Sequence, residues 1–356
     1  MFHMAYMSDE IRSSTDSADH DDPTARSRKR DHIELAFQSQ VAGADLDQRF
    51  FYEPLLAGHP QSGSIPVQTF LGQEMKLPVW VSSMTGGTEL AHTINHNLAR
   101  ACGEFGMGMG LGSCRSLLYD DANLKDFAVR HLMGDQPLYA NLGIAQIEEL
   151  FARNDAERLQ LLVDKLEADG LIIHVNPLQE WLQPEGDRFQ HAPLDTIRRV
   201  IDRFPELSVI VKEVGQGMGI ESLRALLKLP LAAVDFAANG GTNFARLELL
   251  RSDEQKQQIY RELALVGHSA YDMVGLVNRL VEEMGSDIVC RQIIISGGVK
   301  TFLDGYYLTQ KIGLPAIYGQ ASSFLKHARG SYEELCAYVQ AQVEGLELAH
   351  AFLRVR

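Results

Sequence analysis

The chain has little positive charge and few cysteines, and each shortage excludes a class of protein. Its 356 residues include 33 Lys and Arg against 47 Asp and Glu, which gives a net charge of −14. A surface for nucleic acid or an anionic membrane needs excess positive charge, so we expect neither partner. The 4 cysteines lie far apart and form no CxxC pair, which predicts reduced thiols rather than a disulfide framework or a zinc site.

Long hydrophobic runs are also missing from the sequence. No apolar run of about 18 residues occurs that could span a membrane. The N-terminal segment lacks the hydrophobic core of a secretory signal peptide. We therefore expect a soluble, cytoplasmic protein. Hydrophobic residues nevertheless make up 45% of the chain and charged residues 22%, a composition typical of globular proteins with a sizeable core.

The N-terminal segment differs from the rest of the chain. Residues 1–26 are rich in Ser and Asp and have no hydrophobic period, which predicts a disordered extension before a single domain over residues 27–356. A basic patch follows at Arg28, Lys29 and Arg30, with His32 close behind. The ordinary interpretation of such a patch is the solvated start of a helix.

From residue 77 onward, short apolar runs alternate with longer amphipathic segments. The eight runs are Leu77–Ser82, Met107–Gly112, Leu138–Leu142, Leu171–Val175, Val209–Glu213, Ala232–Ala237, Ile293–Ser296 and Ala316–Gly319. The amphipathic segments include Glu148–Ala168, Leu194–Phe204, Ile220–Leu229 and Tyr271–Met284. Eight strand–helix repeats favour a TIM (β/α)₈ barrel, an α/β fold. The alternative is a doubly wound sheet, but that fold usually has six strands, and no GxGxxG follows the first run.

Polar residues and glycines follow every one of these runs. In a (β/α)₈ barrel the chemistry lies at the carboxyl ends of the strands. A glycine pair after one strand is usually only a turn that needs positive φ, but eight such ends together predict one site. The ends are Ser83–Gly87, Gly112–Ser116, Asn141–Gly143, His174–Glu180, Lys212–Gly215, Asn239–Thr242, Ser296–Gly298 and Gly319–Ser322.

Two of these ends predict a phosphate site. Exposed backbone N–H groups after the seventh and eighth strands commonly hold a phosphate, and here those positions are Gly297–Gly298 and Gly319. Lys212 lies within the fifth run, where an unpaired ammonium is expensive to bury. It either forms a salt bridge inside the barrel or faces an anionic ring system or phosphate. His174 is either a hydrogen-bonded core histidine or part of a polar cluster beside a ligand.

The fourth strand end offers a metal ligand. Glu180 is the acidic residue of the His174–Glu180 segment, and Mg²⁺ typically takes one or two carboxylates together with phosphates and water. Arg115 and the basic patch would complete a diphosphate site by charge-assisted hydrogen bonds. The sequence therefore predicts two anionic groups at the barrel, one on a cofactor and one on a substrate.

Taken together, these motifs resemble the type 2 isopentenyl-diphosphate isomerases, which are flavoenzymes with an FMN-binding barrel. The matching segments run in order from about residue 28 to 326, and HVNPLQE (174–180) is the most specific of them. The others are Arg28-Lys29-x-x-His32, Ser83–Gly87, Gly112-Ser113-x-Arg115, Asn141-x-Gly143, Val211–Gly215, Gly240–Thr242, Ser296–Gly298 and Gly319-x-Ala321.

The resemblance implies interconversion of isopentenyl diphosphate and dimethylallyl diphosphate in isoprenoid biosynthesis. It also implies reduced FMN, NADPH as the reductant, Mg²⁺ on Glu180, and a homo-oligomer of tetramer or octamer type. The implied FMN contacts are Ser83, Met84, Thr85, Gly86, Ser113, Asn141, Lys212, Thr242, Gly297, Gly298, Val299, Ala321 and Ser322. The implied substrate contacts are Arg28, Lys29, His32, Ser113, Cys114, Arg115, His174 and Gln179.

The proton-transfer groups are less evident. No Cys or Glu pair is placed to add and remove protons, so on this reading a reduced flavin acts as acid and base, with His174 and Gln179 beside it. Gln179 cannot titrate and is assigned to positioning. Segments Trp181–Pro193 and Leu249–Gly267 are expected to be long loops that close over the substrate. Two alternatives stay open: an FMN-dependent 2-hydroxy-acid oxidase or dehydrogenase, and a non-catalytic flavin-binding regulatory protein.

Overall fold

The computed structural model describes residues 24–83 and 90–356, and the chain divides into two compact units, Met1–Gln48 and Arg49–Arg356. The described part of the first unit contains helix α1 (Ala25–Leu35) and the 3₁₀ turn η1 (Gly43–Asp45). Most of the predicted disordered extension lies outside the described residues, and its last two residues begin α1. The assignment of residues 27–48 to the barrel domain stays a prediction.

The basic patch lies within α1 rather than only at its start. Arg30 and Glu34 form an ion pair of 2.6 Å one helical turn apart, which adds modest support to an exposed helix. Arg28, Lys29 and His32 are exposed on the same helix.

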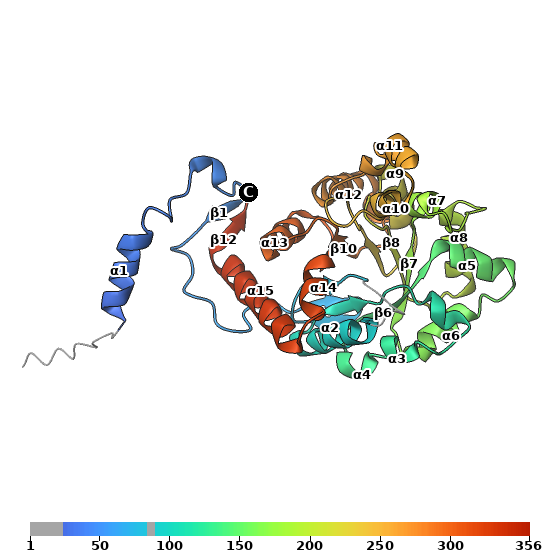
Figure 1. Ribbon diagram of the computed structural model, residues 1–356, viewed down its shortest axis with the longest axis horizontal. Helices are drawn as coiled ribbons and strands as arrows, with labels where there is room; N and C mark the ends of the chain where they lie inside the picture. The colour runs from blue at the N-terminus through green and yellow to red at the C-terminus, as the bar shows by residue number, and fades with distance from the viewer. Residues whose placement is uncertain (1–23, 84–89) are drawn as a thin grey trace, which may run out of the picture. The chain divides into compact units, whose positions relative to one another are not determined.

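The second unit is a closed barrel of eight parallel strands, as the sequence predicts (Figure 1). The strands are β4 (Val79–Val81), β5 (Gly108–Gly110), β6 (Leu138–Gly143), β7 (Gly170–His174), β8 (Val209–Lys212), β9 (Ala233–Asp235), β10 (Ile293–Ser296) and β11 (Ala316–Gln320). Each strand overlaps one predicted apolar run. Consecutive strands are neighbours, and β11 returns to pair with β4 through Tyr318 and Val79. That closing pair excludes the doubly wound sheet, in which the outer strands remain edges.

Helices surround the strands (Figure 1). They are α2 (Ala91–Phe105), α3 (Leu124–Phe127), α4 (Arg130–Met133), α5 (Ile144–Ala152), α6 (Arg158–Lys165), α7 (Pro177–Leu182), α8 (Pro193–Arg203), α9 (Ile220–Leu227), α10 (Phe244–Arg251), α11 (Glu254–Tyr260), α12 (Ala270–Met284), α13 (Phe302–Lys311), α14 (Ser322–Ala328) and α15 (Tyr332–Phe352). Three predicted amphipathic segments form α8, α9 and α12. The fourth divides into α5 and α6, because Asn154 adopts a positive φ of 55° that helices do not continue through.

Short elements complete the unit. They are β1 (Phe50–Tyr52) paired with β12 (Leu353–Val355), the hairpin of β2 (Gln68–Phe70) and β3 (Gln73–Met75), and the 3₁₀ turns η2 (Arg115–Leu118), η3 (Leu263–Leu265) and η4 (Gly285–Asp287). Among the described residues, no helix combines the length and apolar character needed to cross a membrane.

The expected long loop over residues 249–267 is wrong, because this segment is mostly helical. It contains the end of α10, all of α11 and the turn η3. Asn243 and Asp253 cap α10 and α11 by accepting backbone N–H bonds, which satisfies donors that a helix start leaves free. A small separate core joins Leu249 and Ala264 to Leu182 of α7. In the other expected loop, residues 181–182 end α7 and residues 183–192 have no regular structure.

The barrel interior consists of an apolar layer and, two residues further along the strands, a polar one. The apolar layer is formed by Trp80, Tyr139, Ile172, Ile210, Ala233, Ile294 and Ile317, with Phe70 and Met75 added from the β2–β3 hairpin. Side chains alternate between faces along a strand, so residues two positions on also face inward. We call these the polar ring: Ser82, Asn141, His174, Lys212, Asp235 and Ser296. The fold thus brings six polar side chains to the carboxyl ends of six strands.

We expect Gly108→Ala to destabilise the barrel. A Cβ at residue 108 would lie 2.5 Å from the ring of Trp80, which is fully buried and fills the space that the glycine leaves. Overpacking of this kind typically costs about 1–3 kcal/mol, measured as the free energy of unfolding in denaturant.

The matched control is Gly275→Ala in α12, where a Cβ meets no atom within 4 Å. Alanine favours an exposed helix over glycine, so this variant should gain up to about 1 kcal/mol. Equal stability of the two variants would contradict the interior packing described.

Candidate functional site

His174 and Asn141 form a fixed pair in the polar ring. The Nδ2 group of Asn141 donates to the carbonyl of Leu111 at 2.9 Å, which directs its Oδ1 toward His174 Nδ1 at 2.9 Å. Nδ1 therefore carries the proton in the neutral ring, and Nε2 keeps its lone pair. Burial, with a smaller contribution from the charge of Lys212, lowers the pKa of His174 to about 3. His174 is therefore a neutral hydrogen-bonding group.

Lys212 brings a positive charge to the polar ring. It pairs in register with His174 on one side and with Asp235 on the other. Its ammonium donates to the backbone carbonyl of Glu213 at 2.8 Å rather than to a carboxylate. Of the two interpretations of Lys212, a cation held toward a ligand fits this geometry better than a salt bridge inside the barrel.

A pocket opens at the carboxyl ends of β4, β8, β9, β10 and β11; we call it the glycine pocket. Eight of the residues that the resemblance assigns to FMN line it: Ser83, Lys212, Thr242, Gly297, Gly298, Val299, Ala321 and Ser322. Asn141 lies in the neighbouring part of the polar ring, and Ser113 is exposed on the loop after β5. Met84, Thr85 and Gly86 lie outside the described residues.

The backbone of the glycine pocket is suited to an anionic ligand. Gly240, Gly297 and Gly298 have φ values of 117°, 85° and 74°, a left-handed region that favours glycine. A Cβ at residue 297 would lie 2.1 Å from the carbonyl of Ala238, so two strand ends approach closely. The hydroxyl of Ser83 is buried without a hydrogen-bond partner among the described residues. An unpaired hydroxyl beside glycine N–H groups and lysine is the donor set that a phosphate accepts from.

The second part of the site lies at the start of α7. The carboxylate of Glu180 accepts from Asn176 Nδ2 at 2.9 Å and from the backbone N–H of Asp187 at 2.7 Å. Gln179 accepts from the same Asn176 amide at 3.1 Å, and its own Nε2 lies 3.4 Å from Glu248 of α10. Glu180 is half-buried. Among residues 24–83 and 90–356, no three His, Cys, Asp or Glu side chains gather to hold a metal ion, so Glu180 would serve as a single carboxylate ligand.

Asp187 connects this region to Arg115, and the sequence analysis missed it. Its Oδ2 accepts from Arg115 at 3.1 Å and from Gln146 Nε2 at 2.8 Å. Gln146 and Glu248 were missed as well. Gln146 follows the third strand end by three residues, which could have indicated it, whereas nothing in the local sequence around Asp187 or Glu248 distinguishes them from surface acids.

Cys114 does not offer its side chain to a ligand in this structure. It is fully buried, its thiol donates to the carbonyl of Gly112 at 3.3 Å, and burial raises its pKa to about 12. A substrate contact at this position would have to come from the backbone. The predicted contacts of Arg28, Lys29 and His32 belong to the first unit and stay predictions.

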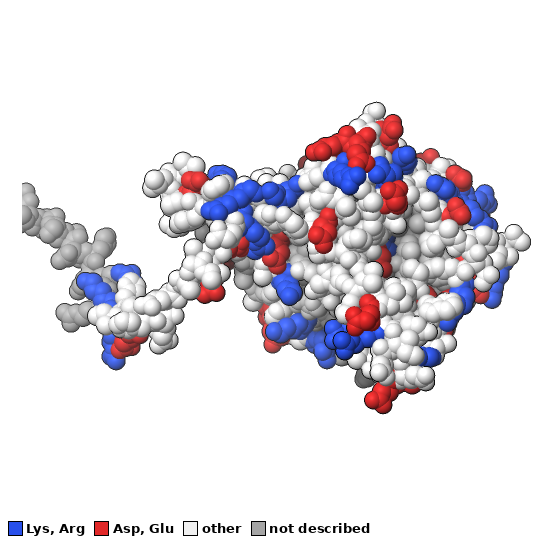
Figure 2. Space-filling model, turned by 90° about the horizontal axis from the view of Figure 1, so that it is seen from above, with Lys and Arg blue, Asp and Glu red and all other residues white. Residues whose placement is uncertain are grey.

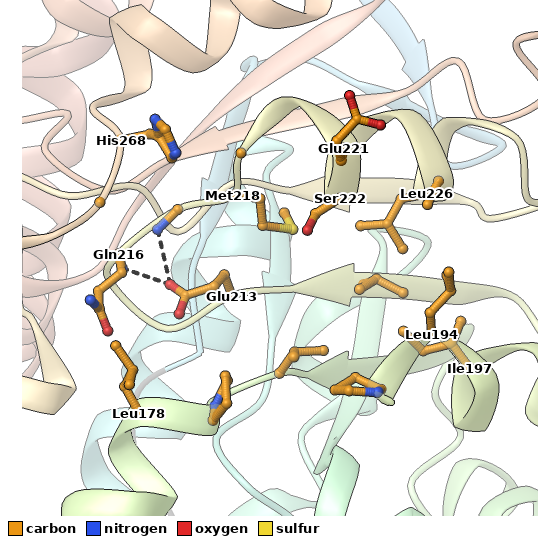
Figure 3. Close-up of a pocket in the computed structure, with 18 of the residues that line it drawn as sticks. Leu178, Leu194, Ile197, Glu213, Gln216, Met218, Glu221, Ser222, Leu226 and His268 are labelled. Atoms are coloured by element: carbon orange, nitrogen blue, oxygen red, sulfur yellow. Dashed lines mark hydrogen bonds between the residues drawn. The ribbon is translucent and has the colours of Figure 1, made fainter. Parts of the chain in front are cut away.

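A larger cavity of about 540 Å³ lies beside β8, outside the barrel (Figure 3). Its wall is mostly apolar, and Glu213 stands at its polar end. Glu213 Oε2 accepts from three consecutive backbone N–H groups, at 2.7 Å from Gly215, 2.6 Å from Gln216 and 3.0 Å from Gly217. No Lys or Arg of the described residues lines the cavity, so it does not suit a diphosphate. The carboxylate of Glu213 instead fixes the turn that follows Lys212.

One face of the barrel unit carries charges of both signs. On the face of the barrel unit shown in Figure 2, acidic and basic side chains are interspersed.

Comparisons with solved structures show the fold. A mandelate oxidase with 3,3-difluoro-2-hydroxy-3-phenylpropionic acid superposes with a TM-score of 0.54 at 14% identity, over 85% of this chain and 82% of that one. A flavocytochrome b2 variant with sulfite bound gives 0.54 at 14% identity, over 85% and 72%. Identity this low carries the barrel architecture and not the activity.

Sequence comparisons go further. No protein-family model matches the chain. The isopentenyl-diphosphate delta-isomerase of Rickettsia africae (strain ESF-5) is 36% identical over 326 residues, which is 90% of this chain and 91% of that protein. The protein of the same name from Rickettsia prowazekii (strain Madrid E) is 34% identical over equal shares. Identity at this level along nearly the whole of both chains means that this chain belongs to the isopentenyl-diphosphate delta-isomerase family.

Proposed function

We propose that this protein interconverts isopentenyl diphosphate and dimethylallyl diphosphate and does so as an FMN-dependent, type 2 member of its family. One observation carries the proposal: two regions suited to anions adjoin at one end of the barrel. The glycine pocket and the start of α7 meet where Lys212 and His174 pair in register. A phosphorylated cofactor and a diphosphate substrate would require such an arrangement.

The residues of the glycine pocket fit FMN. Ser83, Thr242, Gly297 and Gly298 would hold the cofactor through hydroxyl and backbone N–H groups, and Lys212 would offset negative charge on it. A reduced flavin, with NADPH as its reductant, supplies acid–base chemistry that the surrounding side chains lack. An opposite charge at about 4 Å contributes roughly 4 kcal/mol at an effective dielectric of 20, so Lys212 would matter most for an anionic form.

The residues near α7 fit the substrate. Arg115 would bind the diphosphate by charge-assisted hydrogen bonds, with Ser113 beside it and with Arg28, Lys29 and His32 as further donors. Glu180 would bind Mg²⁺ together with phosphate oxygens and water. Asp187 competes with the diphosphate for Arg115, so substrate binding is expected to rearrange this pair.

His174 of the polar ring and Gln179 of α7 would orient the allylic carbons of the substrate without exchanging protons themselves. Gln179 has no titratable group, and the low pKa of His174 keeps its ring neutral near pH 7. His174 Nε2 can accept a hydrogen bond, and Gln179 can donate one. Their role is to fix the substrate while protons move elsewhere.

The alternative functions fit these side chains less well. A 2-hydroxy-acid oxidase needs a histidine that readily takes a proton and an arginine that clamps a carboxylate. His174 resists protonation, because burial lowers its pKa to about 3. A regulatory flavin protein would not need Glu180 and Arg115 beside the cofactor. Cytoplasmic location and a homo-oligomer of tetramer or octamer type are further parts of the proposal.

The test of the function is proton NMR of isopentenyl diphosphate in D₂O, incubated anaerobically with the protein, FMN, Mg²⁺ and NADPH. We expect dimethylallyl diphosphate that carries deuterium, with no NADPH consumed beyond the first flavin reduction. A sample with all components except FMN is the control. Bound flavin without product, followed by turnover of a 2-hydroxy acid, would favour the oxidase.

The metal role predicts a specific loss in Glu180→Gln. The amide cannot supply a negative charge to Mg²⁺, so turnover should fall by at least about tenfold and no longer respond to Mg²⁺, while FMN stays bound. The matched control is Glu185→Gln in the segment that follows α7, an exposed carboxylate paired with Arg251. That variant should keep nearly full turnover. Equal behaviour of both variants would refute the assignment.

The low pKa of His174 predicts two pH effects. The pH profile of activity between pH 5 and 9 should have the same shape in the wild-type protein and in His174→Asn, because the ring of His174 is neutral throughout that range. Below pH 6.5 the unfolded chain protonates this histidine while the folded protein does not, so stability falls toward pH 3 by an amount on the order of a few kcal/mol. Urea unfolding at several pH values should show a smaller fall in His174→Asn. An identical slope in both proteins would contradict the assigned pKa.

A further inference from the structure

Asp235 is a buried acid of the polar ring to which the proposed reaction gives no role. It is fully enclosed at the end of β9. Its Oδ1 accepts from the hydroxyl of Ser296 and lies 3.4 Å from the backbone N–H of Ala237. Its Oδ2 is buried with no hydrogen-bond partner among the described residues. A carboxylate in that state is costly unless a charge nearby compensates for it.

Lys212 is the neighbouring charge. The two residues pair in register on β8 and β9, and adjacent strands lie roughly 4.8 Å apart. Burial raises the pKa of Asp235, and the positive charge of Lys212 acts in the opposite direction. The ammonium of Lys212 has three hydrogens, and one of them is donated to the carbonyl of Glu213. Within the described part of the chain, no hydrogen bond or ion pair joins this ammonium to Asp235, so the two charges interact through space, and the remaining hydrogens are available to a ligand in the glycine pocket.

The other groups around Asp235 do not explain why this position holds an acid rather than an amide. Ser296 and the Ala237 N–H engage one carboxylate oxygen, and an asparagine would accept from both equally well. His174, on the far side of Lys212, is neutral. Among the described polar-ring residues, Lys212 is thus the group whose interaction with residue 235 depends on that residue being an acid.

We propose that Asp235 is a positioning residue that acts through Lys212. It attracts the ammonium across the β8–β9 pair and offsets part of its charge, which sets how strongly the pocket favours negative charge on its ligand. The inference rests on the proposed function to the extent that this ligand is FMN. Asp235 would then adjust the affinity for reduced FMN relative to oxidised FMN, and hence the reduction potential of the bound cofactor.

The central variant is Asp235→Asn, which keeps the shape and the acceptor for Ser296. Removing one neighbouring charge should strengthen binding of reduced relative to oxidised FMN on the order of tenfold, seen as a less negative midpoint potential. Lys212→Gln should shift the potential the opposite way. In the Lys212→Gln background, the effect of Asp235→Asn should largely disappear, because the residue through which it acts is gone.

Two control variants separate charge from structure. Ser296→Ala removes the hydrogen bond but keeps the acid, so the potential should change less than in Asp235→Asn. Glu213→Gln removes a different buried carboxylate, whose side chain lies in the cavity outside the barrel (Figure 3). Its effect on the potential should be smaller than that of Asp235→Asn. A folded, FMN-bound Asp235→Asn protein with an unchanged potential would overturn the proposal, as would a shift that persists in full without Lys212.

A measurement without flavin distinguishes this proposal from the proposed function. Acetic anhydride labels the neutral amine of lysine, and mass spectrometry reads the rate at Lys212 in the protein without cofactor. Loss of the neighbouring carboxylate should speed this labelling several-fold in Asp235→Asn, even if the wild-type protein binds no FMN. An unchanged rate would refute the link to Lys212, whereas faster labelling without FMN binding would refute only the cofactor assignment.

Discussion

The structure depends on one change of chemistry inside the barrel, from an apolar layer to a polar ring two residues further along the strands. The apolar layer, with Trp80 filling the space beside Gly108, provides the burial that stabilises the closed sheet. The polar ring cannot be buried at the same depth without partners. It therefore lies at the strand ends, where hydrogen bonds and a ligand can satisfy it. Stability and function occupy successive layers of the same strands.

The polar ring has a defined distribution of charge. Asn141 holds His174 in one tautomer, and burial keeps that ring neutral. Lys212 supplies the positive charge beside it, and Asp235 is the acid on its other side. Two lysines, Lys212 and Lys300, and several glycines line the glycine pocket, a composition that favours an anion. Such a site can serve several reactions on the same barrel, and in the proposed function the groups around α7 would select a diphosphate.

The α7 region shows how tertiary contacts turn ordinary residues into parts of a site. Asp187 joins Arg115, Gln146 and the carboxylate of Glu180, although these residues follow three different strands of the barrel. Helix α10 lies against α7 and brings Glu248 near Gln179. Because α10 and α11 are capped helices with a small core of their own, this side of the barrel end is built from packed elements rather than from a loop.

The sequence by itself determined the eight strands, the barrel and the residues of the glycine pocket, because strand periodicity and glycine at positive φ are local properties. It also indicated Lys212, His174 and Glu180, which stand out against apolar runs. Only the tertiary structure showed that Lys212 donates to a backbone carbonyl and that Cys114 is enclosed. It also placed Asp187 against Arg115 and Glu248 near Gln179. Those placements depend on contacts between residues tens of positions apart. Such contacts follow from closure of the barrel and from the packing of α10 on α7, and no local sequence pattern predicts either.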